Sequence, residues 1–302
     1  MRLRDLLLAL MVVIVWGSNF VVMKLGLRGM PPLLFCTLRF GFAAFPLVLF
    51  VRRPAAPWGK VVGWGMAQFA VQFGLLLTSL KLGMSAGLAS LVMQLQAFFT
   101  IALAWFVLHE RARAVQLVGG AIALGGMGLV AWNLHEGTSL IGLALLIAGA
   151  LSWAVANVWA KRLGQPNAVA LAGWASLVAV PPLLLMSLLL EGPAADWHAL
   201  RAMDAASWLV IAFQSYPATL FGFGVWAMLM RRYPAAQIAP FTLLVPVSGM
   251  LAATLVLHEP LQAWKLGAGA MVLVGLALNQ WPALRQRLRA REESLAARCA
   301  AP

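Results

Sequence analysis

The chain has 302 residues, of which 63% are hydrophobic and 10% are charged, and its formal net charge is +13. A water-soluble domain has about 45–50% apolar residues, so this composition excludes an ordinary soluble fold. Apolar stretches of about 20 residues, the length that crosses a hydrocarbon layer about 30 Å thick, follow one another with short polar breaks. The shorter alternating segments of a porin-like barrel are absent from the sequence. The sequence therefore predicts an all-α integral membrane protein.

Hydropathy predicts ten transmembrane helices. In chain order they lie near residues 6–26, 32–51, 61–80, 85–108, 115–132, 139–160, 168–190, 206–230, 236–257 and 264–282. The first apolar stretch continues past Trp16 without a small-residue cleavage site, so we expect a retained helix and not a signal peptide. Pro31 and Pro32 open the second helix, a position where proline costs no helix hydrogen bond.

Basic residues are unequally divided between the two sides that these helices define. With the N-terminus inside, sixteen lysines and arginines fall in cytoplasmic segments, five fall on the opposite side, and Arg39 lies within a helix. Because positively charged segments stay in the cytoplasm, we expect a multi-pass protein with both termini cytoplasmic. Topology thus explains the net charge, and we expect contact with the lipid bilayer but not with nucleic acid. Cys36 and Cys299 have no metal-ligand or disulfide spacing, so we expect no metal site.

Two motifs occur twice. The sequence "VLHE" recurs after 149 residues, and "WGSNFVVMKLG" resembles "WAVANVWAKRLG", which lies 137 residues further on. The difference places about 12 extra residues in the second half, most simply in the loop near 191–207. Five helices per unit is an odd number, so the second unit enters the membrane from the opposite side and the ten helices form two inverted five-helix repeats. We predict a first repeat at 5–133, a second repeat at 139–282 and a basic cytoplasmic tail at 283–302.

Longer motifs accompany these repeats. They are "VWG" at 15–17, "WGSNFVVMKLGLRGMPPL" at 16–33, "LRF" at 38–40, "GMSAGLASLVMQLQAFFTI" at 83–101, "APFTLLVPVSG" at 239–249, and "LHE" after the fourth and ninth helices. With these motifs the chain resembles the drug/metabolite transporter superfamily, and specifically its EamA family, over essentially its whole length apart from the tail. Within that family the motifs are most similar to those of members that export O-acetylserine and cysteine.

The resemblance implies a secondary exporter of small amino-acid metabolites in a bacterial-type cytoplasmic membrane, working by alternating access. Export of drugs or of other amino acids by the same fold is the first alternative. A membrane-embedded enzyme is the second, and it would need acidic residues or histidines clustered at active-site depth, whereas the four histidines lie near helix ends or loops. No phosphate-cradling glycine loop is present, so we do not expect direct use of ATP. We expect neither enzymatic activity nor a cofactor. The choice between a monomer and a homo-oligomer stays open.

Arg39 is the most informative candidate for the substrate site. It lies eight residues past Pro31, roughly 12 Å into the second helix, and an intramembrane charge costs about 2.5 kcal/mol or more unless it is paired or hydrated. All nine acidic residues lie at helix ends, in loops or in the tail. Arg39 therefore either faces an aqueous cavity and attracts a substrate carboxylate, or bonds to helix-end carbonyls and holds the fold.

Amides and aromatic residues complete the candidate site. An amide both donates and accepts hydrogen bonds, which suits a zwitterion that must be bound and released, although amides also bond one transmembrane helix to another. Tryptophans could wall the cavity, although belt or packing roles are common for such residues. Tyr216 and Pro217 interrupt the eighth helix, where freed backbone carbonyls could line the pathway or a plain kink could be satisfied by neighbouring helices. The predicted substrate-binding residues beside Arg39 are Gln94, Gln68, Gln72, Asn19, Asn157, Trp16, Trp153 and Tyr216. A further expectation concerns Glu110 and Glu259, which precede the fifth and tenth helices and are predicted to cap them.

Overall fold

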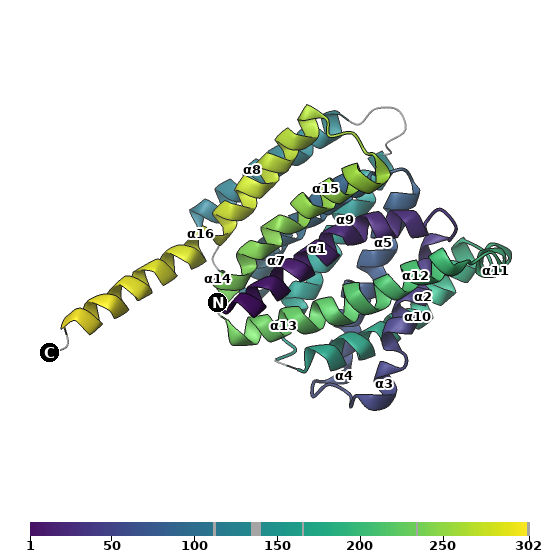
Figure 1. The fold of residues 1–302 in the computed structure, drawn as a ribbon, viewed down its shortest axis with the longest axis horizontal. Helices are drawn as coiled ribbons and strands as arrows, with labels where there is room; N and C mark the ends of the chain where they lie inside the picture. Colours follow the sequence, from purple (N-terminus) through teal and green to yellow (C-terminus); the bar gives the residue numbers. More distant parts are fainter. Residues whose placement is uncertain (111–112, 134–139, 165, 234, 301–302) are drawn as a thin grey trace.

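The computed structural model describes residues 1–302 except 111–112, 134–139, 165, 234 and 301–302, and for residues 235–236, 239 and 282–300 it describes the backbone alone (Figure 1). Nine helices of this described part are long and apolar enough to cross a membrane. A tenth helix, α16 (Ala263–Ala300), completes the all-helical fold. The predicted boundary between the repeats, at 133–139, lies almost entirely outside the described residues.

The first repeat contains five spans. They are α1 (Leu3–Gly26); α2 (Pro32–Ala44) with α3 (Leu47–Phe50); α4 (Trp58–Gly65), η1 (Met66–Val71) and α5 (Gln72–Lys81); α6 (Ala86–Val92), η2 (Met93–Leu95) and α7 (Gln96–Leu108); and α8 (Ala114–Trp132). The predicted spans agree with these helices to within a few residues at each end. The third span begins at Trp58 and not at residue 61, because Pro57 directly before it starts the helix.

The second repeat follows the same plan. Its spans are α9 (Leu140–Ala160); α10 (Ala168–Leu190); α12 (Ala205–Phe213), η3 (Gln214–Phe221) and α13 (Gly222–Arg232); α14 (Ala235–Ile238), η4 (Ala239–Leu243) and α15 (Leu244–Leu257); and α16. The short helix α11 (Pro193–Arg201) occupies the loop in which the sequence placed the extra residues. Asp204 ends this loop as the N-cap of α12, where hydrogen bonds from the Ser207 side chain and backbone lower the pKa of Asp204.

The two repeats share their irregular features. The third span of each contains a π-helical segment, η1 and η3, and the fourth span of each contains a 3₁₀ segment, η2 and η4. His109 and His258 end the fourth and ninth spans in the left-handed conformation, with φ of 54° in both. Equivalent spans also pack on one another, because α2 packs on α10 and α8 on α16 (Figure 1). Contact between the fourth and ninth spans is made by α6 on α15. The predicted fold of ten helices in two inverted repeats is confirmed.

Two faces are defined by the helix ends. The N-terminal face contains the start of α1 and the loops that include residues 51–57, 109–110 and 161–164, and the opposite face contains the loops at 27–31, 82–85, 191–204 and 258–262. In Figure 1, α16 runs beside α8 and then continues beyond the bundle on the side of the N-terminus. The predicted basic tail is therefore a continuation of α16 up to Ala300, although its side chains are not described.

Close backbone contact between α1 and α15 joins the repeats beside the cavity. A Cβ atom added to Gly17 would lie 2.8 Å from both the Gly249 nitrogen and the Val245 oxygen. Only a residue without a side chain allows this approach, which is the geometry that small residues provide between membrane helices. Gly17 thereby brings Trp16 and Asn19 to the surface between the two repeats.

The predicted capping roles of Glu110 and Glu259 are wrong. Glu259 accepts hydrogen bonds from the Ala86 and Gly87 nitrogens, at 2.8 and 3.1 Å, and so caps the fourth span instead of the tenth. Glu110 accepts two hydrogen bonds of 2.7 Å from the Lys161 ammonium group. A left-handed residue at the end of each preceding helix turns the glutamate away from the helix that follows it.

Candidate functional site

A cavity of about 330 Å³ lies between the two repeats. This volume is at the lower end of the range of about 300–1,000 Å³ that small-molecule pockets occupy. Polar side chains in its wall belong to α1, α2, η1, α5, η2, α7, α9 and η4, so both repeats contribute. The cavity extends to Ala160, which ends α9 at the N-terminal face. Its position between inverted repeats is the place where secondary transporters bind their substrates.

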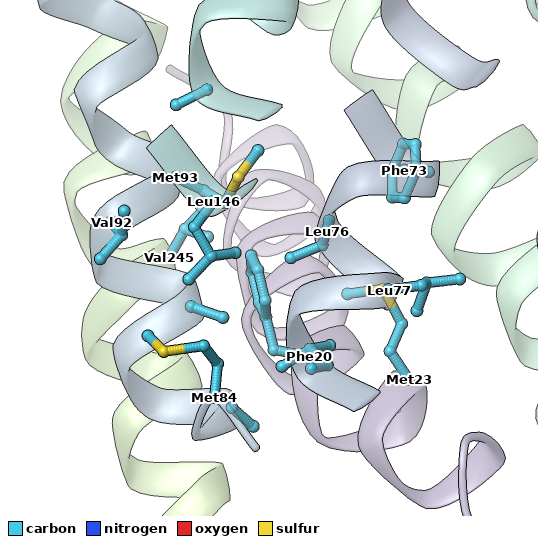
Figure 2. Close-up of a cluster of buried hydrophobic side chains, with 14 of the residues drawn as sticks. Phe20, Met23, Phe73, Leu76, Leu77, Met84, Val92, Met93, Leu146 and Val245 are labelled. Carbon is cyan, nitrogen blue, oxygen red and sulfur yellow. The ribbon is translucent and has the colours of Figure 1, made fainter. Parts of the chain in front are cut away.

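An apolar cluster closes the cavity on the side of the opposite face. Phe20, Leu76 and Met93 form its inner surface, and Leu77 and Met84 are fully buried beyond them (Figure 2). All seven residues of α6 are buried in this region, whereas Ala104 is the one buried residue of α7, which runs to the N-terminal face. The described conformation is thus closed at the opposite face and reaches toward the N-terminal face.

Arg39 contributes its guanidinium group to the cavity wall. Its Nε and Nη2 donate to the Thr219 hydroxyl oxygen at 3.3 and 3.1 Å, and the Phe73 ring centre lies 4.0 Å from its Cζ. Nη1 faces the Met23 sulfur at 3.9 Å, which is a weak acceptor. No acidic side chain pairs with Arg39 among the described residues. The cavity wall therefore contains a positive charge that is 1% exposed and has one nitrogen without an oxygen partner.

The orientation of Arg39 depends on the π-helical segment of the eighth span. Thr219 accepts from Arg39 while its own hydroxyl donates to the Gln214 carbonyl at 2.8 Å, a bond that spans five residues. Hydrogen bonds between residues i and i+5 are the pattern of a π-helix. Pro217 lies within η3 and has no backbone N–H to donate to a regular α-helical hydrogen bond. Ser215 donates in turn to the Arg39 carbonyl at 2.8 Å. These bonds fix α2 against η3 and hold the guanidinium at the wall.

Asn19 offers an unused acceptor at the same cavity. Its side chain is 6% exposed, and no hydrogen bond reaches its Oδ1 among the described residues. A buried polar atom without a partner costs about 1–3 kcal/mol, so the position favours a ligand or water that donates to it. Asn19 lies one helical turn before Met23 on α1, and both residues line the cavity.

The glutamines form a polar strip along the wall. Gln68 donates to the Gln72 side-chain oxygen at 2.7 Å, which uses one donor and one acceptor of this pair. Gln94 donates weakly to the Ser90 carbonyl at 3.5 Å. Each side chain keeps further donor or acceptor capacity, since an amide has two of each. The glutamine strip is uncharged and can therefore bind polar solutes through hydrogen bonds alone.

Asn157 connects two helices at the cavity wall. Its Nδ2 donates to the Gln96 side-chain oxygen at 2.7 Å and to the Thr100 hydroxyl at 3.1 Å. These bonds join α9 to α7, so Asn157 has a structural contact as well as a position beside the cavity. The structure agrees here with the helix-joining role of membrane amides.

Aromatic rings form the wall nearer the N-terminal face. Trp16 packs against Phe223 and Trp226 with ring centres 5.7 and 5.3 Å apart, and its indole nitrogen donates to the Ala218 carbonyl at 3.0 Å. Trp153 lines the cavity from α9. The cavity wall therefore combines these aromatic rings with the polar strip of glutamines.

Eight of the nine predicted site residues line the cavity, and their role in binding stays a prediction. The eight are Arg39, Gln94, Gln68, Gln72, Asn19, Asn157, Trp16 and Trp153. Tyr216 is 41% exposed and does not line the cavity described here. Thr219 was not predicted from the sequence, because its contact with Arg39 joins residues 180 positions apart. Trp64, Phe223 and Thr242 were also missed, since an aromatic or hydroxyl residue in a membrane helix carries no specific signal.

Two inverted repeats around a polar cavity are the architecture of a secondary membrane transporter. The model of the EamA-like transporter family matches residues 3–132 and again residues 140–280. The chain therefore belongs to the EamA-like transporter family, and it is a multi-pass membrane transporter and not an enzyme.

Individual relatives agree with this assignment. The protein named "Probable amino-acid metabolite efflux pump" of Salmonella typhimurium is 41% identical over 285 residues, which cover 92% of this chain and 95% of that protein. A protein of the same name from Escherichia coli is 39% identical over equal shares of both chains. One solved crystal structure has a TM-score of 0.65 and 20% identity, and it covers 95% of this chain and 99% of its own. At that identity the crystal structure supports the fold alone.

Proposed function

We propose that this chain exports small amino-acid metabolites of the O-acetylserine and cysteine kind by alternating access. The observation that carries the proposal is Arg39, whose Nη1 has the Met23 sulfur as its one hydrogen-bond partner within the described part of the chain. A substrate carboxylate is the group that best completes a guanidinium, because hydrogen bonds between charged groups are short and strong. The names of the 41% and 39% identical relatives agree with this substrate class.

Asn19 supplies the complementary half of an amino-acid site. The free Oδ1 accepts a hydrogen bond from an ammonium group, while Arg39 binds the carboxylate. Since the two groups differ in charge, the substrate binds in one orientation. No aspartate or glutamate is among the described residues that line the cavity, so the ammonium group is bound by an amide and weakly enough for release into the opposite compartment.

The orientation of the chain and the described conformation both support loading from the cytoplasmic side. The excess of lysine and arginine in segments of the N-terminal face supports a bacterial-type cytoplasmic membrane in which that face and both termini lie on the cytoplasmic side. The cavity reaches toward the same face, so this conformation is the one that loads substrate from the cytoplasm. Release then requires the apolar cluster of Figure 2 to open and the N-terminal face to close.

Counterflow in proteoliposomes tests the proposal. Vesicles with purified protein are loaded with excess unlabelled O-acetylserine or cysteine, and labelled solute is added outside. We expect labelled solute to accumulate above the level of protein-free vesicles, and the accumulation to be lost in Arg39→Gln. No accumulation of either solute, under conditions where another amino acid or a drug exchanges, would contradict the proposed substrate class.

A further inference from the structure

Two lysine–glutamate pairs occupy equivalent places in the two repeats. Lys24 and Lys161 each lie eight residues after the tryptophan of the repeated "W…N…K" motif. Glu259 and Glu110 each follow a left-handed histidine, at the end of the ninth and fourth spans. The inverted repeat puts the first pair at the opposite face and the second pair at the N-terminal face.

The pair at the N-terminal face is joined directly. Both carboxylate oxygens of Glu110 accept from the Lys161 ammonium at 2.7 Å. The two side chains are about half exposed, at 46% and 53%. They lie on the face toward which the cavity extends.

The pair at the opposite face forms no ion pair among the described residues, and each member instead binds the connection between the third and fourth spans. Lys24 donates to the Leu80 and Met84 carbonyls at 2.8 and 2.6 Å. Glu259 accepts from the Ala86 and Gly87 nitrogens at 2.8 and 3.1 Å. The four backbone groups belong to one short stretch, residues 80–87, which lies over the apolar cluster that closes the cavity.

The repeat relates residues 80–87 to residues 229–236 without a gap. Leu80 corresponds to Leu229, Met84 to Tyr233, and Ala86 to Ala235, the first residue of α14. The same relation maps Leu77, fully buried in the apolar cluster, onto Trp226, which lines the cavity. One connection is thus held by its lysine and glutamate over a closed end of the cavity. At the N-terminal face, where the cavity is not closed, Lys161 and Glu110 form an ion pair with one another.

We infer that Lys24 with Glu259, and Lys161 with Glu110, are gating residues of the transport cycle that exchange partners in opposite senses. At a closed face, the lysine and glutamate bind the carbonyls and amides of the helix connection. At an open face, the connection moves away and the two charges neutralise one another. After the transition, Lys24 pairs with Glu259. Lys161 then binds the carbonyls of Leu229 and Tyr233, and Glu110 binds the backbone nitrogens of Ala235 and Ala236. The inference rests on the alternating-access transport proposed above.

The exchange keeps the charged groups bonded throughout the cycle. A lysine or glutamate at the membrane edge that lost its partner would cost free energy and raise the barrier to opening. Because each charge has a second partner at its own face of the membrane, opening that face replaces charge-assisted hydrogen bonds with an ion pair, and closing the other face does the reverse. The two conformations therefore differ little in electrostatic free energy, which suits a carrier that must populate both.

Thiol labelling of Leu77→Cys measures the opening of the opposite face. The variant is made with Cys36→Ala and Cys299→Ser, and a membrane-impermeant maleimide is applied without substrate. We expect slow labelling in this background and about tenfold faster labelling when Glu259→Gln is added, because capping two amides at the closed face stabilises more than a solvent-exposed ion pair at the open face; tenfold corresponds to a difference of about 1.4 kcal/mol. Glu110→Gln should not speed labelling, because it weakens the closed state of the other face. Combining both substitutions should return the rate toward that of the background.

Glu191→Gln is the matched control. Glu191 also lies at the opposite face and accepts from the Leu33 and Leu34 nitrogens at 2.8 and 3.1 Å, but it lies outside the repeated motif. We expect it to lower thermal stability without a change in Leu77→Cys labelling. Equal labelling in Glu259→Gln and in the background, or equal acceleration by Glu110→Gln and Glu259→Gln, would overturn the inference. The labelling assay contains no substrate. A failed counterflow assay therefore contradicts the proposed substrate class, whereas unchanged labelling in Glu259→Gln contradicts the gating inference.

Discussion

Replacing Arg39 with methionine separates a binding role from a structural one. In the structure Arg39 bonds to one hydroxyl oxygen and stacks on Phe73, and no carboxylate neutralises it among the described residues. A charge within a membrane helix costs about 2.5–3.5 kcal/mol, whereas a cation–π contact returns about 0.5–2 kcal/mol. Thr219 keeps its own bond to the Gln214 carbonyl when the guanidinium is removed. We therefore expect Arg39→Met to be as stable as the natural protein, or more stable.

Substrate affinity should respond in the opposite way. A hydrogen bond between charged groups contributes about 1.5–3 kcal/mol, so loss of the guanidinium should raise the half-saturating concentration of a carboxylate substrate by about 10- to 150-fold. Thermal unfolding of purified protein and the concentration dependence of counterflow measure the two effects. Arg28→Met is a matched control, since Arg28 is exposed at the opposite face and does not line the cavity. A large loss of stability in Arg39→Met with unchanged half-saturation would refute the reasoning and assign Arg39 to the fold.

Three further predictions concern stability. Gln214 is fully buried and both of its side-chain polar atoms lack partners among the described residues, so Gln214→Met should raise the unfolding temperature; a fall would indicate a bound water that the glutamine holds. Glu191→Ala should cost about 1–2 kcal/mol by uncapping α2, measured as a lower unfolding temperature, with transport per folded molecule unchanged as the check. Gly17→Leu should prevent the approach of α1 to Gly249 and greatly reduce the yield of folded protein in detergent, and normal yield would contradict this packing.

Hydropathy and the internal repeat were sufficient to predict the architecture. The length of each apolar stretch determines how many helices cross the membrane, and an odd number per repeat determines their inversion. The polar residues within those helices were also informative, because a charge or amide in a membrane helix is costly unless it faces a cavity or a partner. Arg39, Asn19 and the glutamines line the cavity for this reason.

The remaining features depend on contacts that no local pattern encodes. The π-helical segment η3 changes the direction of the side chains that follow Gln214, so a regular helix could not show that Thr219 meets Arg39 while Tyr216 points outward. The partners of Glu110 and Glu259 were mispredicted because the N-terminus of any nearby helix attracts a carboxylate. Tertiary packing decides whether the carboxylate meets a distant helix, as Glu259 does, or a lysine, as Glu110 does. Sequence spacing alone favoured the next helix along the chain.

The central claim, that the cavity binds an amino-acid carboxylate through Arg39, is tested most directly with two competitors of matched shape. Counterflow of labelled solute is measured in the presence of the unlabelled amino acid or of its carboxamide, which lacks the negative charge. The account predicts that the acid competes at least about tenfold more strongly than the amide in the natural protein, and that this preference disappears in Arg39→Met. Equal competition by acid and amide in the natural protein would contradict the account.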